Sequence, residues 1–102
     1  MWKTISVNSR TQNLLKTLAS TSRLKILECI RDGVVEPSQI GTRLGLANST
    51  ILQHLKILLD SKIITKSMLQ SDSNQLIIKY EIEDDAEKFI STILNTCKNF
   101  LE

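Results

Sequence analysis

Residues Ile40–Ile64 read IGTRLGLANSTILQHLKILLDSKII, and the fold depends on this stretch. A step of 100° per residue over Asn48–Asp60 predicts an amphipathic helix. Its apolar arc holds Ile51, Leu52, Leu55, Leu58 and Leu59. Its opposite arc is short and polar and holds Ser49, Thr50, Gln53, Lys56 and Asp60. Such a face suits the DNA major groove, where amide side chains pair with adenine and lysine reaches guanine or phosphate. An ordinary solvated helix face is the competing interpretation.

A shorter helix over residues 37–44 is predicted directly before it. Pro37 fits the first helical turn, because its missing N–H would be unpaired there. Gly41 in its middle costs about 1 kcal/mol relative to alanine, which predicts a close helix crossing. Gly45 ends this helix, and Asn48 or Ser49 can cap the next one, with backbone donors free for a phosphate. Two helices joined by such a turn form a helix-turn-helix.

After Asp60 the apolar period changes from 3.6 to 2, which predicts a β-hairpin. Its strands are expected at residues 63–69 and 76–82, with the turn formers of residues 71–74 between them. A hairpin that follows a helix-turn-helix makes a winged helix.

Helices are also predicted over residues 9–19 and 84–101. Another helix is predicted to follow the possible caps Ser20, Thr21 and Ser22 and to run to about Asp32. The last one starts with Asp84 and Glu87 in the spacing of a capping box. Its apolar stripe is wide, and a dimer interface is favoured over folding back on the same domain, because helix-turn-helix proteins usually read two half-sites. The residues expected in this interface are Phe89, Ile90, Ile93, Leu94, Cys97 and Phe100.

The chain of 102 residues is expected to form one domain over 1–102, with 41% hydrophobic and 24% charged residues. No apolar run approaches the roughly 20 residues that span a membrane, and no secretory signal is recognisable, so no membrane contact is expected. We expect a cytoplasmic location, in the host cell if the sequence is viral. Cys29 and Cys97 lie in helical patterns, which favours two reduced core thiols over a disulfide or a redox sensor.

Charge is unevenly distributed along the chain. Residues 1–80 hold eleven Lys and Arg against five Asp and Glu, a balance of +6, whereas residues 81–102 hold two against six, a balance of −4. A basic body with an acidic end is compatible with one surface that faces DNA and another that faces elsewhere.

The runs LASTSRLKILECIRDG, PSQIGTRLGL, STILQHLKILLDSKII and IIKYEI resemble the ArsR-type winged-helix transcription regulators over residues 14–82. The resemblance implies a mainly α fold with a small β-hairpin (α+β): a winged helix-turn-helix of five helices and a two-stranded wing. It also implies a homodimer through helices 9–19 and 84–101, which adds Leu14 and Leu18 to the interface. Helix 48–60 would lie in the major groove of double-stranded DNA.

The sequence departs from this family at several positions. Helix 37–44 has no Cys and the last helix has no His, so no metal site is expected. Glu36 replaces the usual Ser or Thr cap, and Lys62 replaces a Gly, which predicts a left-handed lysine. The wing tip carries Asp72 in place of an arginine, so the resemblance does not extend to insertion of the wing into the minor groove.

The sequence therefore predicts a sequence-specific homodimeric DNA-binding transcription regulator, a repressor. The alternative is a protein-interaction module that binds DNA weakly or not at all. Gln53 is the candidate for reading a base. For His54 a packing role is favoured over a functional one, and a DNA contact is the alternative. The predicted DNA contacts are Arg43, Asn48, Ser49, Thr50, Gln53, His54, Lys56, Lys66 and Lys79. The chain offers no catalytic constellation and no phosphate loop, so neither an enzyme nor a cofactor is expected.

Overall fold

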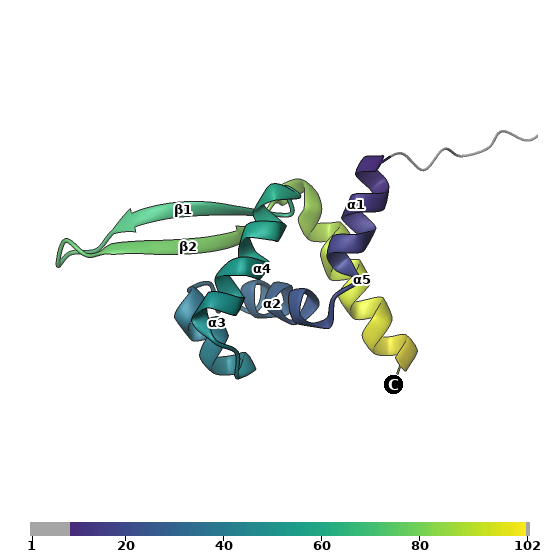
Figure 1. Ribbon diagram of the computed structural model, residues 1–102, viewed down its shortest axis with the longest axis horizontal. Coiled ribbons are helices and arrows are strands. Elements are labelled where there is room, and N and C mark those ends of the chain that lie inside the picture. The colour runs from purple at the N-terminus through teal and green to yellow at the C-terminus, as the bar shows by residue number, and fades with distance from the viewer. Residues whose placement is uncertain (1–8, 102) are drawn as a thin grey trace, which may run out of the picture.

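Figure 1 shows a computed structural model, which describes residues 9–101, with side chains described except at 10, 11 and 97–101. Over these residues the order is α1 (Ser9–Leu18), α2 (Thr21–Arg31), α3 (Pro37–Leu44), α4 (Asn48–Asp60), β1 (Ile64–Gln70), β2 (Leu76–Ile82) and α5 (Asp84–Leu101). The predicted winged helix-turn-helix, with five helices and a two-stranded wing, is confirmed. The helices form a body from which the hairpin extends.

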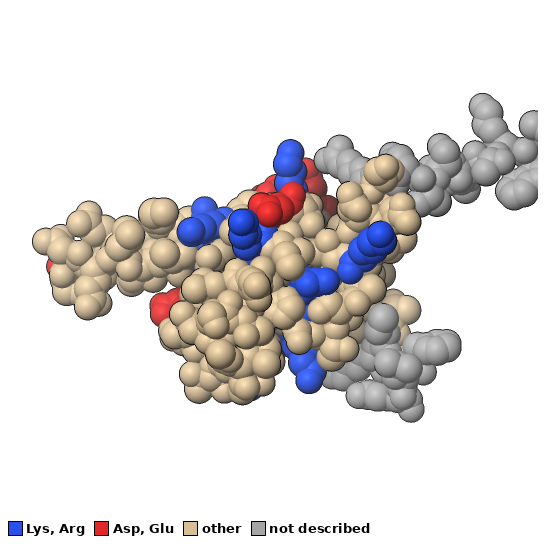
Figure 2. Space-filling view, viewed as in Figure 1, with Lys and Arg blue, Asp and Glu red and all other residues tan. Residues whose placement is uncertain are grey.

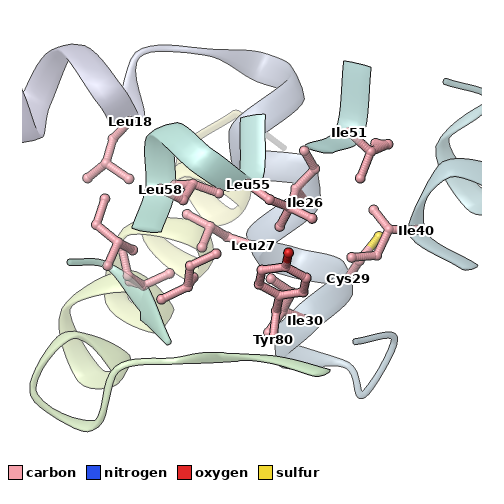
Figure 3. Packing of buried hydrophobic residues seen from close by; sticks show 13 residues of the cluster. Leu18, Ile26, Leu27, Cys29, Ile30, Ile40, Ile51, Leu55, Leu58 and Tyr80 are labelled. Atoms are coloured by element: carbon pink, nitrogen blue, oxygen red, sulfur yellow. The ribbon is translucent and has the colours of Figure 1, made fainter. Parts of the chain in front are cut away.

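The core lies between α2 and α4, as Figure 3 shows. Ile26 and Leu27 of α2 and Leu55 and Leu58 of α4 have no exposed surface. Every other element adds at least one buried side chain: Leu18 from α1, Ile40 from α3, Ile64 from β1, Tyr80 from β2 and Ile90 from α5. Burial of such a side chain contributes about 1.5–3 kcal/mol. One side of α4 is thus fixed to the body, which leaves its other side available.

The turn between α3 and α4 is tight because two glycines allow it. Gly45 ends α3 in the left-handed region, with φ of 69°, and the Leu46 N–H donates to the Gly41 carbonyl at 3.0 Å. A Cβ on Gly41 would lie 3.0 Å from the Leu46 carbonyl oxygen and 3.6 Å from Cγ1 of Ile51. The predicted close crossing is confirmed, and it sets where α4 starts.

The caps of two helices differ from the prediction. The residue that precedes α4 as its cap is Ala47, which has no side-chain acceptor, so the expected cap at Asn48 or Ser49 is wrong. Likewise Asp84 is the first residue of α5 rather than its cap, and Glu83 precedes it, accepting the Ala86 and Glu87 N–H groups on its carbonyl. The polar residues are displaced by one position into each helix.

The end of α4 is built around Lys62, which has a φ of 60° as predicted. The Lys62 N–H donates to the Leu59 carbonyl at 3.0 Å and the Ile63 N–H to the Leu58 carbonyl at 3.1 Å. This is the Schellman arrangement, in which glycine normally takes the left-handed position. It holds Ile63 at the helix end, so β1 starts at Ile64, one residue later than expected.

The hairpin is antiparallel, with Ile64 opposite Ile82 and Gln70 opposite Leu76. Its inner end belongs to the core, since Tyr80 is 4% exposed and its N–H donates to the Val35 carbonyl at 3.1 Å. Its outer half leaves the helical body (Figure 1). The exposed fractions there are 60% for Met68, 50% for Leu69 and 64% for Leu76. The wing therefore has a supported base and an unsupported outer half.

None of the helices in the described part of the chain is long and apolar enough to cross a membrane.

Candidate nucleic-acid interface

The outward side of α4 carries the polar residues that the sequence predicted there. Ser49, Gln53, Lys56 and Asp60 are exposed, and Thr50 is half-buried. Since residues three and four apart are neighbours on a helix, the four exposed residues form one continuous face. Among the described residues this face is therefore exposed along its whole length.

The N-terminal end of this face suits an anion better than its C-terminal end. No side chain caps α4, so the N–H groups of its first turn are left to other acceptors. Such groups, together with the helix dipole, favour a phosphate. Asp60 at the other end would repel one. Contact with DNA is therefore expected over the first two to three turns, up to about Lys56.

Leu52 was expected on the apolar arc, but it is 43% exposed. The buried side of α4 is narrower than the sequence suggested, because Ile51, Leu55 and Leu58 fill the space against α2 and α3. Leu52 lies at the border of the exposed face. Ile57, at 40% exposed, lies at its opposite border, next to the cleft beside α1.

Arg43 is not brought together with the α4 face. Its guanidinium lies 4.0 Å from the carboxylate of Asp32, just after α2. Gly41 marks the side of α3 that faces α4, and a residue two positions later lies about 200° around the helix. The structure thus puts Arg43 on a different flank.

The two wing lysines lie on opposite faces of the hairpin, because Lys66 is opposite Tyr80 and Lys79 is opposite Ser67 in adjacent register positions. Lys79 is paired with Glu81 at 3.1 Å, which weakens it as a phosphate contact. Figure 2 shows basic side chains where the hairpin leaves the body and none on the visible face of its outer half. Residues 67–78 indeed hold a single charged residue, Asp72.

His54 belongs to a polar network that joins three helices. The Arg23 Nε donates to the Thr17 carbonyl at 2.6 Å, and its Nη1 lies 3.4 Å from Nδ1 of His54. The Thr17 hydroxyl lies 3.0 Å from the Ser61 hydroxyl at the end of α4. Burial, and secondly the neighbouring Arg23, lower the pKa of His54 below its ordinary value of 6.5. The half-buried position fits the packing role that the sequence favoured.

The sequence did not single out Thr17, Arg23 and Ser61 as a group. They come from α1, α2 and the end of α4, and no spacing in the sequence relates them. This network borders an open cleft of about 1350 Å³ between α1, the end of α4 and the start of α5, whose apolar wall includes Leu14 and Phe89.

The predicted interface residues whose side chains are described fall into three groups by exposure. Leu18 and Ile90 are 6% and 1% exposed and lie in the protomer's own core. Leu14, Ile93 and Leu94 are half-buried against that core, whereas Phe89 remains 43% exposed. The first part of α5 thus folds back on its own domain, and an outward apolar surface remains at Phe89 and at Leu15 of α1, which is 55% exposed. The side chains of Cys97 and Phe100 lie outside the described ones.

Cys29 is buried in the core with a free thiol, as expected, and burial raises its pKa. Within residues 9–101, as far as their side chains are described, no three His, Cys, Asp or Glu residues come together in a way that could hold a metal ion.

A helix-turn-helix, a fixed second helix with a free polar side and a following hairpin define the winged-helix class. Solved structures share this fold. HlyU from Vibrio cholerae N16961, in its reduced form, has a TM-score of 0.69 at 21% identity, covering 86% of this chain and 88% of that chain. Mb0332 from Mycobacterium bovis, a homodimeric winged helix-turn-helix DNA-binding domain and a possible ArsR-family transcriptional regulator, has a TM-score of 0.69 at 20% identity, covering 91% and 82%. A possible transcriptional regulator from Methanosarcina mazei Go1 has a TM-score of 0.58 at 17% identity, covering 88% and 80%.

The family is shown by sequence: residues 12–76 match the N-terminal domain of the methanogenesis regulatory protein FilR1, and the chain belongs to this family. It is therefore a winged-helix regulator domain and not an enzyme, and the fold that the resemblance to ArsR-type regulators implies is confirmed. No curated protein matches the chain in sequence.

Proposed function

We propose that the protein is a transcription regulator that binds double-stranded DNA in a sequence-specific manner, as a homodimer, with α4 in the major groove. The observation that carries this proposal is the exposed face of Ser49, Gln53 and Lys56 on a helix whose other side is buried. Gln53 is the base-reading residue, because an amide can pair with both N6 and N7 of adenine. Ser49, Thr50 and the first N–H groups of α4 bind phosphates, together with Lys56 and Lys66. The regulator acts as a repressor by occupying its operator, in the cytoplasm.

The dimer is proposed to form through α1 and α5. Leu15 and Phe89 expose large apolar surfaces there, and the hairpin extends away from this side of the body (Figure 1). A two-fold dimer would present two α4 helices to successive major grooves, about 34 Å apart.

A titration of wild-type protein against random duplex DNA by fluorescence anisotropy, at low and raised salt, tests DNA binding. The logarithm of the binding constant should fall linearly with the logarithm of salt concentration, with a slope of about −0.9 for each phosphate neutralised. Absence of binding at both salt concentrations would reject the proposal.

Sedimentation of Phe89→Glu tests the dimer separately. A charge in a buried apolar interface should yield monomers, whereas Leu76→Glu, on the exposed wing, should leave the dimer intact. A dimer that survives Phe89→Glu would place the interface elsewhere.

The outer wing favours a second candidate function, that of a protein-interaction module. Met68, Leu69 and Leu76 are all at least half exposed, and the surrounding residues 67–78 carry no basic charge. Such a surface attracts protein more readily than DNA. This candidate predicts almost no DNA binding at either salt concentration, so the same titration separates the two.

A further inference from the structure

Leu52 is a large apolar residue that α4 leaves exposed to solvent. It is 43% exposed, and it is not among the half-buried apolar residues that pack against the core, whereas Leu59 on the same helix is. On the helix surface it is three residues after Ser49 and four before Lys56, so it lies beside both. Gln53 has the same two neighbours. Ser49, Leu52, Gln53 and Lys56 therefore form one exposed cluster on α4.

Single exposed leucines are common and need no explanation by themselves. Leu52, however, lies in the N-terminal half of α4, where no side chain caps the first turn, and not near Asp60 at the other end. The N-terminal residues of a recognition helix are those that reach base edges. In the major groove the one apolar group that a base pair presents is the C5-methyl of thymine. An apolar side chain that lies across Ser49 and Lys56 from Gln53 therefore matches an A·T pair near the adenine that Gln53 reads.

The composition of α4 points the same way. Bidentate Arg or Lys is the commonest partner of guanine, yet α4 contains no arginine, and Lys56 is its one lysine. Its other exposed polar side chains in this half are the amides and hydroxyls of Asn48, Ser49 and Gln53. The exposed side chains in this half of α4 therefore suit contacts with adenine and thymine, and only Lys56 could pair with guanine.

We infer that Leu52 is a specificity-determining residue that packs on a thymine methyl group, and that the half-site contacted by α4 is A·T-rich. This inference rests on the proposed DNA binding and extends it to the class of sequence recognised.

Duplexes selected from a random pool by the wild-type protein provide the test. The selected half-sites should be enriched in A·T pairs, and replacing thymine by deoxyuridine, which removes only the methyl group, should weaken binding about fourfold for each contacted methyl. In Leu52→Ala this difference between the two duplexes should disappear. Ile57→Ala is the matched control, because Ile57 is similarly exposed on α4 but lies on the opposite border of the face, more than one turn further from the N-terminus of the helix, where it lines the cleft beside α1, and it should retain the difference.

The outcomes distinguish this inference from the proposed function. Binding that depends on salt but shows no A·T enrichment, or a methyl dependence that persists in Leu52→Ala, would overturn the role of Leu52 and leave DNA binding intact. Failure of the wild-type protein to bind any duplex would reject the proposed function itself. Leu52→Ala should bind the deoxyuridine duplex like wild type, which shows that the variant is folded.

Discussion

Helix α4 and the β1–β2 hairpin are the two elements that a winged helix can present to DNA, and they are built differently here. The helix has a buried side, with Leu55 and Leu58 fully enclosed, and a polar side with Lys56. The outer hairpin has no core beneath it and carries Asp72 as its single charge. A basic side chain that can attract phosphate and a buried side that fixes the element in place are thus found together on α4. The outer wing has neither.

The largest contrast is expected in stability. Leu55→Ala would remove a fully buried side chain from α4 and should lower the free energy of unfolding by about 2–5 kcal/mol, because a cavity remains. Leu76→Ala on the outer wing should change it by no more than about 0.5 kcal/mol. Urea denaturation measures both values. Equal losses would show that the outer wing is packed against something and would remove the contrast.

The next contrast concerns DNA affinity. Gln53→Ala should weaken binding to the selected operator by about 1–3 kcal/mol, because the two hydrogen bonds between the amide and adenine are lost. Binding to random DNA should change little. Gln75→Ala, which removes an exposed amide from the wing turn, should leave operator affinity unchanged. Anisotropy titrations of the two variants at one salt concentration give the comparison. Equal loss on operator and random DNA would reject base reading by Gln53.

The two elements also each contain a residue other than glycine in the left-handed region, Lys62 after α4 and Asn74 in the wing turn, with φ of 60° and 63°. Lys62→Gly should raise the free energy of unfolding by about 0.5–1 kcal/mol, since a lysine pays a steric cost there that glycine does not. Asn74→Gly should have a smaller effect, because asparagine tolerates this conformation. Thermal and urea unfolding test both; a destabilised Lys62→Gly would mean that the lysine side chain makes a stabilising contact.

The smallest expected effect is a loss of stability on acidification, which arises from His54 of α4 and has no counterpart in the hairpin. The folded protein holds a proton on His54 less tightly than the unfolded chain does, because burial and then Arg23 lower its pKa below 6.5. The unfolded state therefore binds more protons between the lowered pKa and 6.5, and acidification through that interval should reduce stability. Below the lowered pKa the loss is complete. In His54→Gln, measured beside wild type from pH 7.5 to 5, this part of the decline should be missing.

The sequence predicted the elements well, because α4 and the hairpin have clear and different apolar periods. The strand Leu76–Ile82 and helices α3 and α4 have the expected bounds. The predicted caps, Asn48 or Ser49 for α4 and Asp84 for α5, were wrong, because each helix is preceded by another residue and Asn48 and Asp84 already lie in its first turn. Local sequence does not distinguish these two positions.

Only the part of the candidate site that lies within one helix could be predicted from the sequence. The face with Ser49, Gln53 and Lys56 follows from periodicity. The exposure of Leu52 depends on how widely α2 and α3 cover α4, which no pattern within α4 contains. The placement of Arg43 beside Asp32, likewise, depends on the orientation of α3 against α2.

The crossing at Gly41 has a consequence for genetics. A methyl group there would push against the Leu46 carbonyl, 3.0 Å away, and so against the peptide that leads into α4. A screen for alleles that lose regulation should therefore recover substitutions at this glycine, although it touches no nucleotide. Such alleles would report the alignment of the reading helix, and they should be separable from contact alleles because they reduce binding to every sequence alike.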